Sequence, residues 1–211
     1  MKWSGSIMSN TYQVVRDFEA RVAEFCGSRY AVSVDSCSNA LLLCCKYVDV
    51  STYSEIIIPA RTYPSVPCSI IHAGGRVTFE QKMWKGAYKL EPTRIVDSAK
   101  RFHRGCYEPD TFTCLSFHVK KFLPIGRGGM ILTDNADAMA WLKSARFDGR
   151  HECSLESDQL ECVGHNCYML PEQAARGMTL MDFIETHELG DLEEEPYQDL
   201  SKYKMYTEAN R

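Results

Sequence analysis

The sequence has no long apolar segment, no basic cluster and no recognisable leader. No apolar run approaches the roughly 20 residues that a helix needs to cross a bilayer, so we expect no membrane partner. Residues 1–6 lead into no apolar stretch with a cleavage site, which predicts a cytoplasmic protein. The 24 basic residues are outnumbered by 28 acidic ones, for a net charge of −4, and this balance argues against a nucleic-acid partner.

Cysteine is abundant, but its spacing predicts neither disulfides nor a zinc site. Most of the ten cysteines lie inside apolar runs, so we interpret them as reduced thiols of the core. One group within a short span has zinc-type side chains, namely His151, Cys153, Cys162, His165 and Cys167. Because the paired Cys-x-x-Cys spacing of zinc ribbons is absent, we expect no metal here.

Apolar periodicity predicts an α/β fold with a mostly parallel sheet flanked by helices on both faces. Buried strands are expected at residues 30–34, 55–59, 76–79, 94–97, 113–117 and 129–133. Helices are expected at residues 11–26, 40–48, 65–73, 136–146 and 171–185. Ligands of such sheets bind at the carboxyl ends of the strands, where the sequence places Ser36, Tyr63, Asp97 and Ser116.

Two short polar stretches stand out, and each has two interpretations. Residues 116–121, Ser-Phe-His-Val-Lys-Lys, follow a strand and precede a glycine-rich turn. A desolvated lysine there can attack a carbonyl as a neutral amine, whereas a solvated pair would have no such role. The turn at residues 35–39, Asp-Ser-Cys-Ser-Asn, can bind an anion at a helix start or can simply cap that helix.

Seven stretches together resemble one family of enzymes. They occur in the family's order and cover most of residues 1–185: Phe18-Glu19 with Phe25-Cys26-Gly27, residues 34–41, residues 57–63, residues 95–99, residues 116–121, Gly128-Gly129 with Thr133-Asp134, and residues 164–166 with 173–175. The chain resembles the DegT/DnrJ/EryC1/StrS family of aminotransferases, which depend on pyridoxal 5'-phosphate (PLP). The resemblance implies the large domain of a fold type I PLP-dependent transferase.

The resemblance also implies roles for individual residues. Lys121, with Lys120 as the neighbouring alternative, would form an imine with PLP, and Asp97 would pair with its pyridine nitrogen. The turn at Ser36, Cys37 and Ser38 would hold the cofactor phosphate together with Ser116. Tyr63 and Ala99 would pack on the two faces of the ring, and Lys100 would lie near the phenolic oxygen. The implied reaction moves an amino group, with glutamate as donor, to a keto sugar nucleotide, in a homodimer.

The sequence also departs from the family pattern. Only 15 residues separate Gln81 from Asp97, so a βα unit is expected to be missing, and Cys37 and Lys100 replace the usual residues. Residues 1–185 would form a compacted PLP-binding domain, and residues 186–211 an acidic extension in place of most of the small C-terminal domain. These departures leave two alternatives, a PLP enzyme of another substrate class and a degenerate, non-catalytic binding subunit.

Overall fold

The computed structural model describes residues 11–192 and 196–209, and two sheets organise them. A five-stranded sheet has the order β1-β7-β6-β5-β4, and a second sheet pairs β2 with β3. The strands are β1 (Tyr30–Val34), β2 (Glu55–Pro59), β3 (Arg76–Glu80), β4 (Tyr88–Leu90), β5 (Ile95–Asp97), β6 (Phe112–Ser116) and β7 (Gly129–Thr133). A single antiparallel bridge, Ile57 to Glu91, connects the two sheets.

Strand directions confirm the expected sheet, with two reversed members. β7 is antiparallel to both of its neighbours, β1 and β6, while β6 and β5 are parallel. β4 is antiparallel to β5 and, through the bridge, to β2. Five of the seven described strands therefore run in one direction, and their carboxyl ends share an edge.

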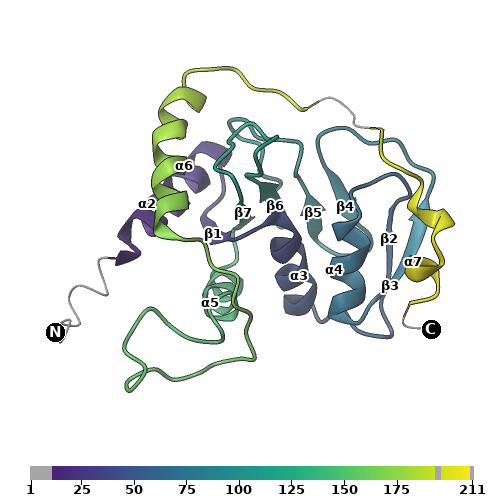
Figure 1. Cartoon of the computed structure of the whole chain (residues 1–211), viewed down its shortest axis with the longest axis horizontal. Coiled ribbons are helices and arrows are strands. Elements are labelled where there is room, and N and C mark those ends of the chain that lie inside the picture. Colours follow the sequence, from purple (N-terminus) through teal and green to yellow (C-terminus); the bar gives the residue numbers. More distant parts are fainter. Residues whose placement is uncertain (1–10, 193–195, 210–211) are drawn as a thin grey trace.

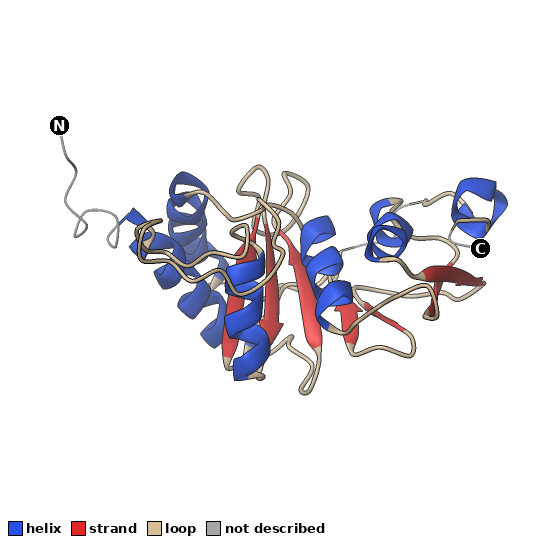
Figure 2. Ribbon diagram, turned by 90° about the horizontal axis from the view of Figure 1, so that it is seen from below, coloured by secondary structure: helices blue, strands red, loops and turns tan. Residues whose placement is uncertain are grey.

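Helices cover both faces of the sheet, as the periodicity predicts (Figures 1 and 2). Along β7, Ile131 packs into the core under α3, α4 and α5, whereas Met130 and Leu132 pack into the core under α2 and α6. The helices are α2 (Gln13–Cys26), α3 (Cys37–Tyr47), α4 (Ser65–Ala73), α5 (Ala136–Ala145) and α6 (Pro171–Ile184). This alternation is the period of two that a strand covered on both sides requires.

A buried ion pair joins three of these elements. Glu19 of α2 and Arg146, just after α5, are each 3% exposed, and their side chains contact each other directly. Arg146 also donates to the Ser33 carbonyl and hydroxyl oxygens of β1, at 2.6 and 2.8 Å. Burial alone would raise the pKa of Glu19, but the charges of Arg146 and Lys143 hold that pKa below its ordinary value. The carboxylate therefore stays ionised inside the fold.

The interval between Gln81 and Asp97 contains one strand that the periodicity did not predict. β4 is only three residues long, yet it pairs with β5 along its whole length and fills the sheet edge beside Asp97. The sheet therefore continues through a short reversed strand where the expected βα unit is missing. One face of β4 has two buried residues, Tyr88 and Leu90, and the other has only Lys89, which is too little to reveal a period in the sequence.

Helix starts and the C-terminal segment refine the predictions further. α3 begins at Cys37 rather than at residue 40, because Ser36 already caps it. Near the end of the chain, η1 (Leu200–Lys202) and α7 (Lys204–Thr207) pack beside β2 and β3, and Leu200 donates its N–H to the Ala60 carbonyl at 2.8 Å. The boundary at residue 186 stays a prediction, and residues 193–195 of the acidic run lie outside the described residues.

The remaining predictions concern the N-terminus, membrane helices and the cysteines. Residues 1–6, which the sequence predicts not to be a leader, lie outside the described residues. Among those described, no helix is both long and apolar enough to span a bilayer. The ten cysteines are free thiols, and six of them are buried in the core.

Candidate active site

A cavity of about 230 Å³ lies at the shared edge where the parallel strands end. Its walls come from segments that are far apart in the sequence, after β1, β2, β5 and β6. All nine residues predicted to contact the cofactor line it, namely Ser36, Cys37, Ser38, Tyr63, Asp97, Ala99, Lys100, Ser116 and Lys121. The alternative lysine, Lys120, lines it as well.

Asp97 ends β5 inside this cavity and is only 4% exposed. Its Oδ1 accepts from the Ala99 N–H at 3.1 Å, and its Oδ2 accepts from the Tyr88 hydroxyl at 2.9 Å. Burial raises the pKa of Asp97, although both hydrogen bonds and the charge of Lys121 oppose this rise. The carboxylate is therefore desolvated but held by two donors, which suits it to pair with a cationic ring nitrogen.

Tyr88 is the main site residue that the sequence did not reveal. Burial and the charge of Asp97 raise the pKa of its hydroxyl well above the ordinary value, so Tyr88 stays protonated. Its single proton is donated to Asp97, so the short hydrogen bond with Thr62 must be donated by the threonine hydroxyl. A relay from Thr62 through Tyr88 thus fixes the carboxylate of Asp97.

The predicted phosphate turn is built at the first turn of α3. The Ser36 hydroxyl accepts from the Asn39 N–H at 3.3 Å, so this serine does cap the helix. Gly129 of β7 packs directly against the turn, because a Cβ on Gly129 would lie 2.5 Å from the Ser36 carbonyl carbon and 2.6 Å from the Cys37 nitrogen. Cys37 is the first residue of α3 and has no left-handed φ, so a side chain there is compatible with the backbone.

The two lysines differ in their placement. Lys121 is half-buried and Lys120 is exposed, and the Lys121 N–H closes a turn onto the His118 carbonyl at 2.8 Å. The charge of Lys121 lowers the pKa of both Asp97 and Cys37, against the larger effect of their burial. Of Lys120 and Lys121, it is therefore Lys121 whose charge acts on the groups inside the cavity.

The remaining predicted contacts lie at different depths. Tyr63 stands at the rim with 58% of its surface exposed, whereas Lys100 is 3% exposed. The Lys100 ammonium lies over two rings, 5.6 Å from the centroid of Trp84 and 4.9 Å from that of Tyr197. Trp84 and Tyr197 were not predicted to line the site, and Tyr197 reaches it from the C-terminal segment.

The cysteine and histidine group of residues 151–167 has a different environment. His151 contacts the carboxylates of Asp158, at 2.8 Å, and Glu161, at 3.4 Å. Within residues 11–192 and 196–209, no group of three or more possible ligands could hold a metal ion.

The cavity fits PLP on three structural grounds. The first turn of α3 lines the cavity, and N–H groups at the start of a helix can bind a phosphate. Asp97 supplies a buried carboxylate for a pyridinium nitrogen, and Lys121 supplies an amine within the same cavity. PLP, when bound, serves as an electron sink for carbanion chemistry at an amino-bearing carbon.

Comparison with known proteins shows the family of the chain. The model of the DegT/DnrJ/EryC1/StrS aminotransferase family matches residues 3–96 and 103–189. The chain belongs to this family. Members of the family are PLP-dependent aminotransferases.

Three relatives show the extent of the similarity. This family member is 37% identical to the spore coat polysaccharide biosynthesis protein SpsC of Bacillus subtilis, over 78% of this chain and 55% of SpsC. It is 30% identical to the dTDP-3-amino-3,6-dideoxy-alpha-D-galactopyranose transaminase of Aneurinibacillus thermoaerophilus, over 39% of this chain and 23% of that protein. The fold matches the PLP-form of Streptococcus pneumoniae Spr1654 with a TM-score of 0.68 and 15% identity, over 88% of this chain and 66% of that one. The chain thus spans about half the length of SpsC.

Proposed function

We propose that this chain binds PLP and transfers an amino group from glutamate to a keto sugar nucleotide. The supporting observation is the single cavity that unites Lys121, Asp97 and the Ser36–Ser38 turn. The substrate class is favoured by the family and by the transaminase relative, whose name refers to an amino sugar linked to dTDP. We include a homodimer in the proposal, because the cavity is open at Tyr63 and Lys120, where a second chain can cover it.

The residues of this chain would divide the chemistry as follows. Backbone N–H groups at the start of α3 and the Ser36 and Ser116 hydroxyls would hold the phosphate. Asp97 would hold the ring nitrogen in its protonated form, and Tyr88 would keep that carboxylate oriented. The Lys121 amine would attach the cofactor and then carry a proton to and from the substrate carbon.

The test is covalent trapping of PLP on the full chain. Borohydride reduction after incubation with PLP should attach one cofactor to the peptide that contains Lys121, as read by mass spectrometry. Lys121→Ala should abolish the adduct, while Lys120→Ala, the matched control, should retain it because Lys120 is exposed at the rim. An adduct on Lys120, or none on the wild-type protein, would exclude the proposed site. In a separate sample that is not reduced, glutamate should shift the absorbance of the bound cofactor if the reaction is transamination.

A further inference from the structure

Residues 196–209 form a C-terminal segment that lies beside the sheet of β2 and β3. The family model that matches this chain ends before the segment begins. Backbone contacts nevertheless attach the segment to the end of β2. Leu200 donates its N–H to the Ala60 carbonyl at 2.8 Å, and Asp199 forms an antiparallel bridge with Arg61. The segment is therefore fixed beside the cofactor cavity although the family pattern does not include it.

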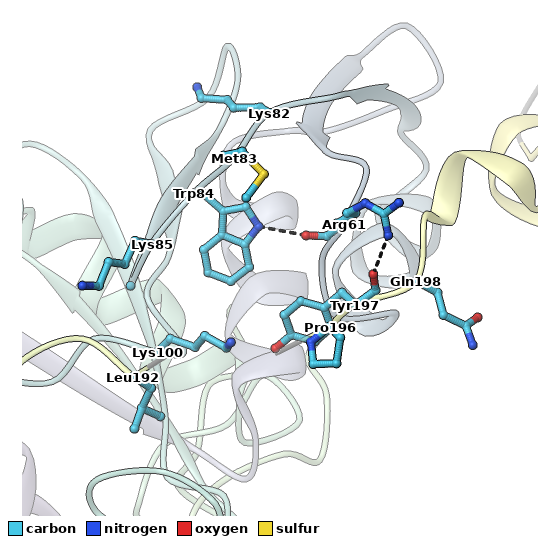
Figure 3. A pocket seen from close by; sticks show the side chains of 11 residues that line it. Arg61, Lys82, Met83, Trp84, Lys85, Lys100, Leu192, Pro196, Tyr197 and Gln198 are labelled. Atoms are coloured by element: carbon cyan, nitrogen blue, oxygen red, sulfur yellow. Dashed lines mark hydrogen bonds between the residues drawn. The ribbon is translucent and has the colours of Figure 1, made fainter. Parts of the chain in front are cut away.

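Tyr197 is the residue that this segment contributes to the cofactor cavity. Its ring is half-buried and nearly parallel to that of Trp84, at an interplanar angle of 14° and a centroid separation of 6.1 Å. Figure 3 shows how both residues are held. The Trp84 indole N–H donates to the Arg61 carbonyl at 2.8 Å, and the Arg61 guanidinium donates to the Tyr197 carbonyl at 3.0 Å. The two rings therefore keep one arrangement before any ligand binds.

The ring contacts continue from Trp84 to Asp97. The Trp84 ring packs on that of Tyr88 at a centroid separation of 4.7 Å and an angle of 59°. Tyr88 is 7% exposed, and its hydroxyl donates to Asp97 at 2.9 Å. Because the ring of Tyr88 is packed, the place of its hydroxyl depends on the rings against which it rests. We call the three rings of Tyr197, Trp84 and Tyr88 the aromatic row.

The position of Tyr197 favours more than space filling. In the described part of the chain, Tyr197 belongs to neither hydrophobic core cluster, whereas Tyr88 belongs to one of them. The aromatic row therefore begins outside the core and ends at a hydrogen bond to a buried carboxylate. A ring in this position restrains a polar contact of the site rather than the packing of the core.

We propose that Tyr197 is a positioning residue that acts on Asp97 through the aromatic row. Its ring restrains Trp84, which restrains Tyr88 and the hydrogen bond that Tyr88 donates. That this carboxylate holds a cofactor rests on the proposed function, whereas the restraint on the hydrogen bond does not. A segment outside the family pattern thereby takes part in the cofactor site.

The first test follows the hydroxyl proton of Tyr88 by NMR in the full chain without cofactor. This proton is buried and hydrogen-bonded, so it should exchange slowly with water, and its signal is identified by its absence from Tyr88→Phe. Tyr197→Leu should make the exchange about two- to tenfold faster, as the loss of one aromatic pair predicts. Tyr197→Phe retains the ring and should restore most of the protection.

Tyr203→Leu is the matched control for the exchange measurement. Tyr203 lies in the same segment and is 39% exposed, but it does not line the cofactor cavity, so its loss should leave the exchange unchanged. Denaturant midpoints confirm that each variant is folded. The inference is overturned by rapid exchange in the wild-type protein, by an unchanged rate in Tyr197→Leu, by an equal effect of Tyr203→Leu, or by no recovery in Tyr197→Phe.

The second test is a double-mutant cycle on the dissociation constant of PLP. Tyr197→Leu should weaken PLP binding about two- to tenfold in the wild-type background. It should have a smaller effect in the Tyr88→Phe background, because the hydrogen bond on which Tyr197 acts is then already gone. Equal weakening in both backgrounds would mean that Tyr197 does not act through Tyr88, and this result would refute the proposed route.

The outcome is separable from that of the proposed function. PLP trapped on Lys121 together with an unchanged exchange rate in Tyr197→Leu would refute the role of Tyr197 and leave the cofactor site intact. The expected exchange rates without a PLP adduct on the wild-type protein would refute the proposed function and support the action of Tyr197 on Asp97.

Discussion

The hydrogen bond from Tyr88 to Asp97 predicts a pH-dependent effect on PLP binding when it is removed. Tyr88→Phe removes one of the two donors to a carboxylate that is 4% exposed. A hydrogen bond to a charged group contributes about 1.5 to 3 kcal/mol. Because the cavity reaches solvent at its rim, water can replace part of this hydrogen bond. At low pH we therefore expect Tyr88→Phe to weaken PLP binding by about 1.5 kcal/mol, which is roughly tenfold in the dissociation constant.

The sign follows from the state of Asp97 that binds the cofactor. Tyr88 opposes the rise that burial produces in the pKa of Asp97, so its removal raises that pKa further. Pairing with a pyridinium nitrogen requires the carboxylate, and a protonated Asp97 must first lose its proton. The ratio of PLP dissociation constants, variant over wild type, should therefore be largest at pH values below the wild-type pKa of Asp97. It should approach one at pH values above that of the variant.

The assay is a PLP titration across pH, monitored by absorbance, on both proteins. Taking the ratio at each pH cancels the ionisations of the cofactor itself. Tyr107→Phe is the control, because Tyr107 is also buried but its hydroxyl bonds to the Asp134 N–H and the Thr111 carbonyl, outside the cavity. A ratio that is constant with pH would mean that Tyr88 acts only through packing, and a ratio of one throughout would refute its role.

Two further predictions concern the turn and the assembly. Gly129→Ala places a Cβ 2.5 Å from the Ser36 backbone, so we expect a loss of about 1 to 3 kcal/mol in the free energy of unfolding and weaker PLP binding. Denaturant unfolding should show no such loss for Gly190→Ala, which meets no atom within 4 Å, and an unchanged midpoint for Gly129→Ala would contradict the close approach. Light scattering should give twice the 24.0 kDa mass of the chain if the proposed homodimer forms, and a monomer at working concentration would exclude it.

The centre of the site was predictable from the sequence because it lies at strand ends. Asp97 and Ser116 each close a strand that the apolar pattern reveals, and the carboxyl ends of such strands meet at one edge. The pattern could not decide between Lys120 and Lys121, since adjacent residues in a turn have no period. The turn that closes onto His118 is the feature that separates the half-buried lysine from the exposed one.

The rest of the site was not predictable, for two physical reasons. Tyr88 belongs to a strand of three residues, which is too short to establish an alternation. Tyr197 comes from a segment without periodicity, and contacts such as those of Leu200 and Arg61 tie that segment to the end of β2. Both residues depend on tertiary contacts that no local pattern encodes.

The short segment between β3 and β5 connects the two halves of the site. In the family pattern a longer βα unit is expected here, and its absence suggested a degenerate protein. In this chain Tyr88 of the segment donates to Asp97, and Trp84 lines both the cofactor cavity and a neighbouring pocket of about 360 Å³. Their rings pack at 4.7 Å, so a displacement of one would move the other. Replacing the segment would therefore move the carboxylate of Asp97 and the wall that Trp84 contributes to the cavity together.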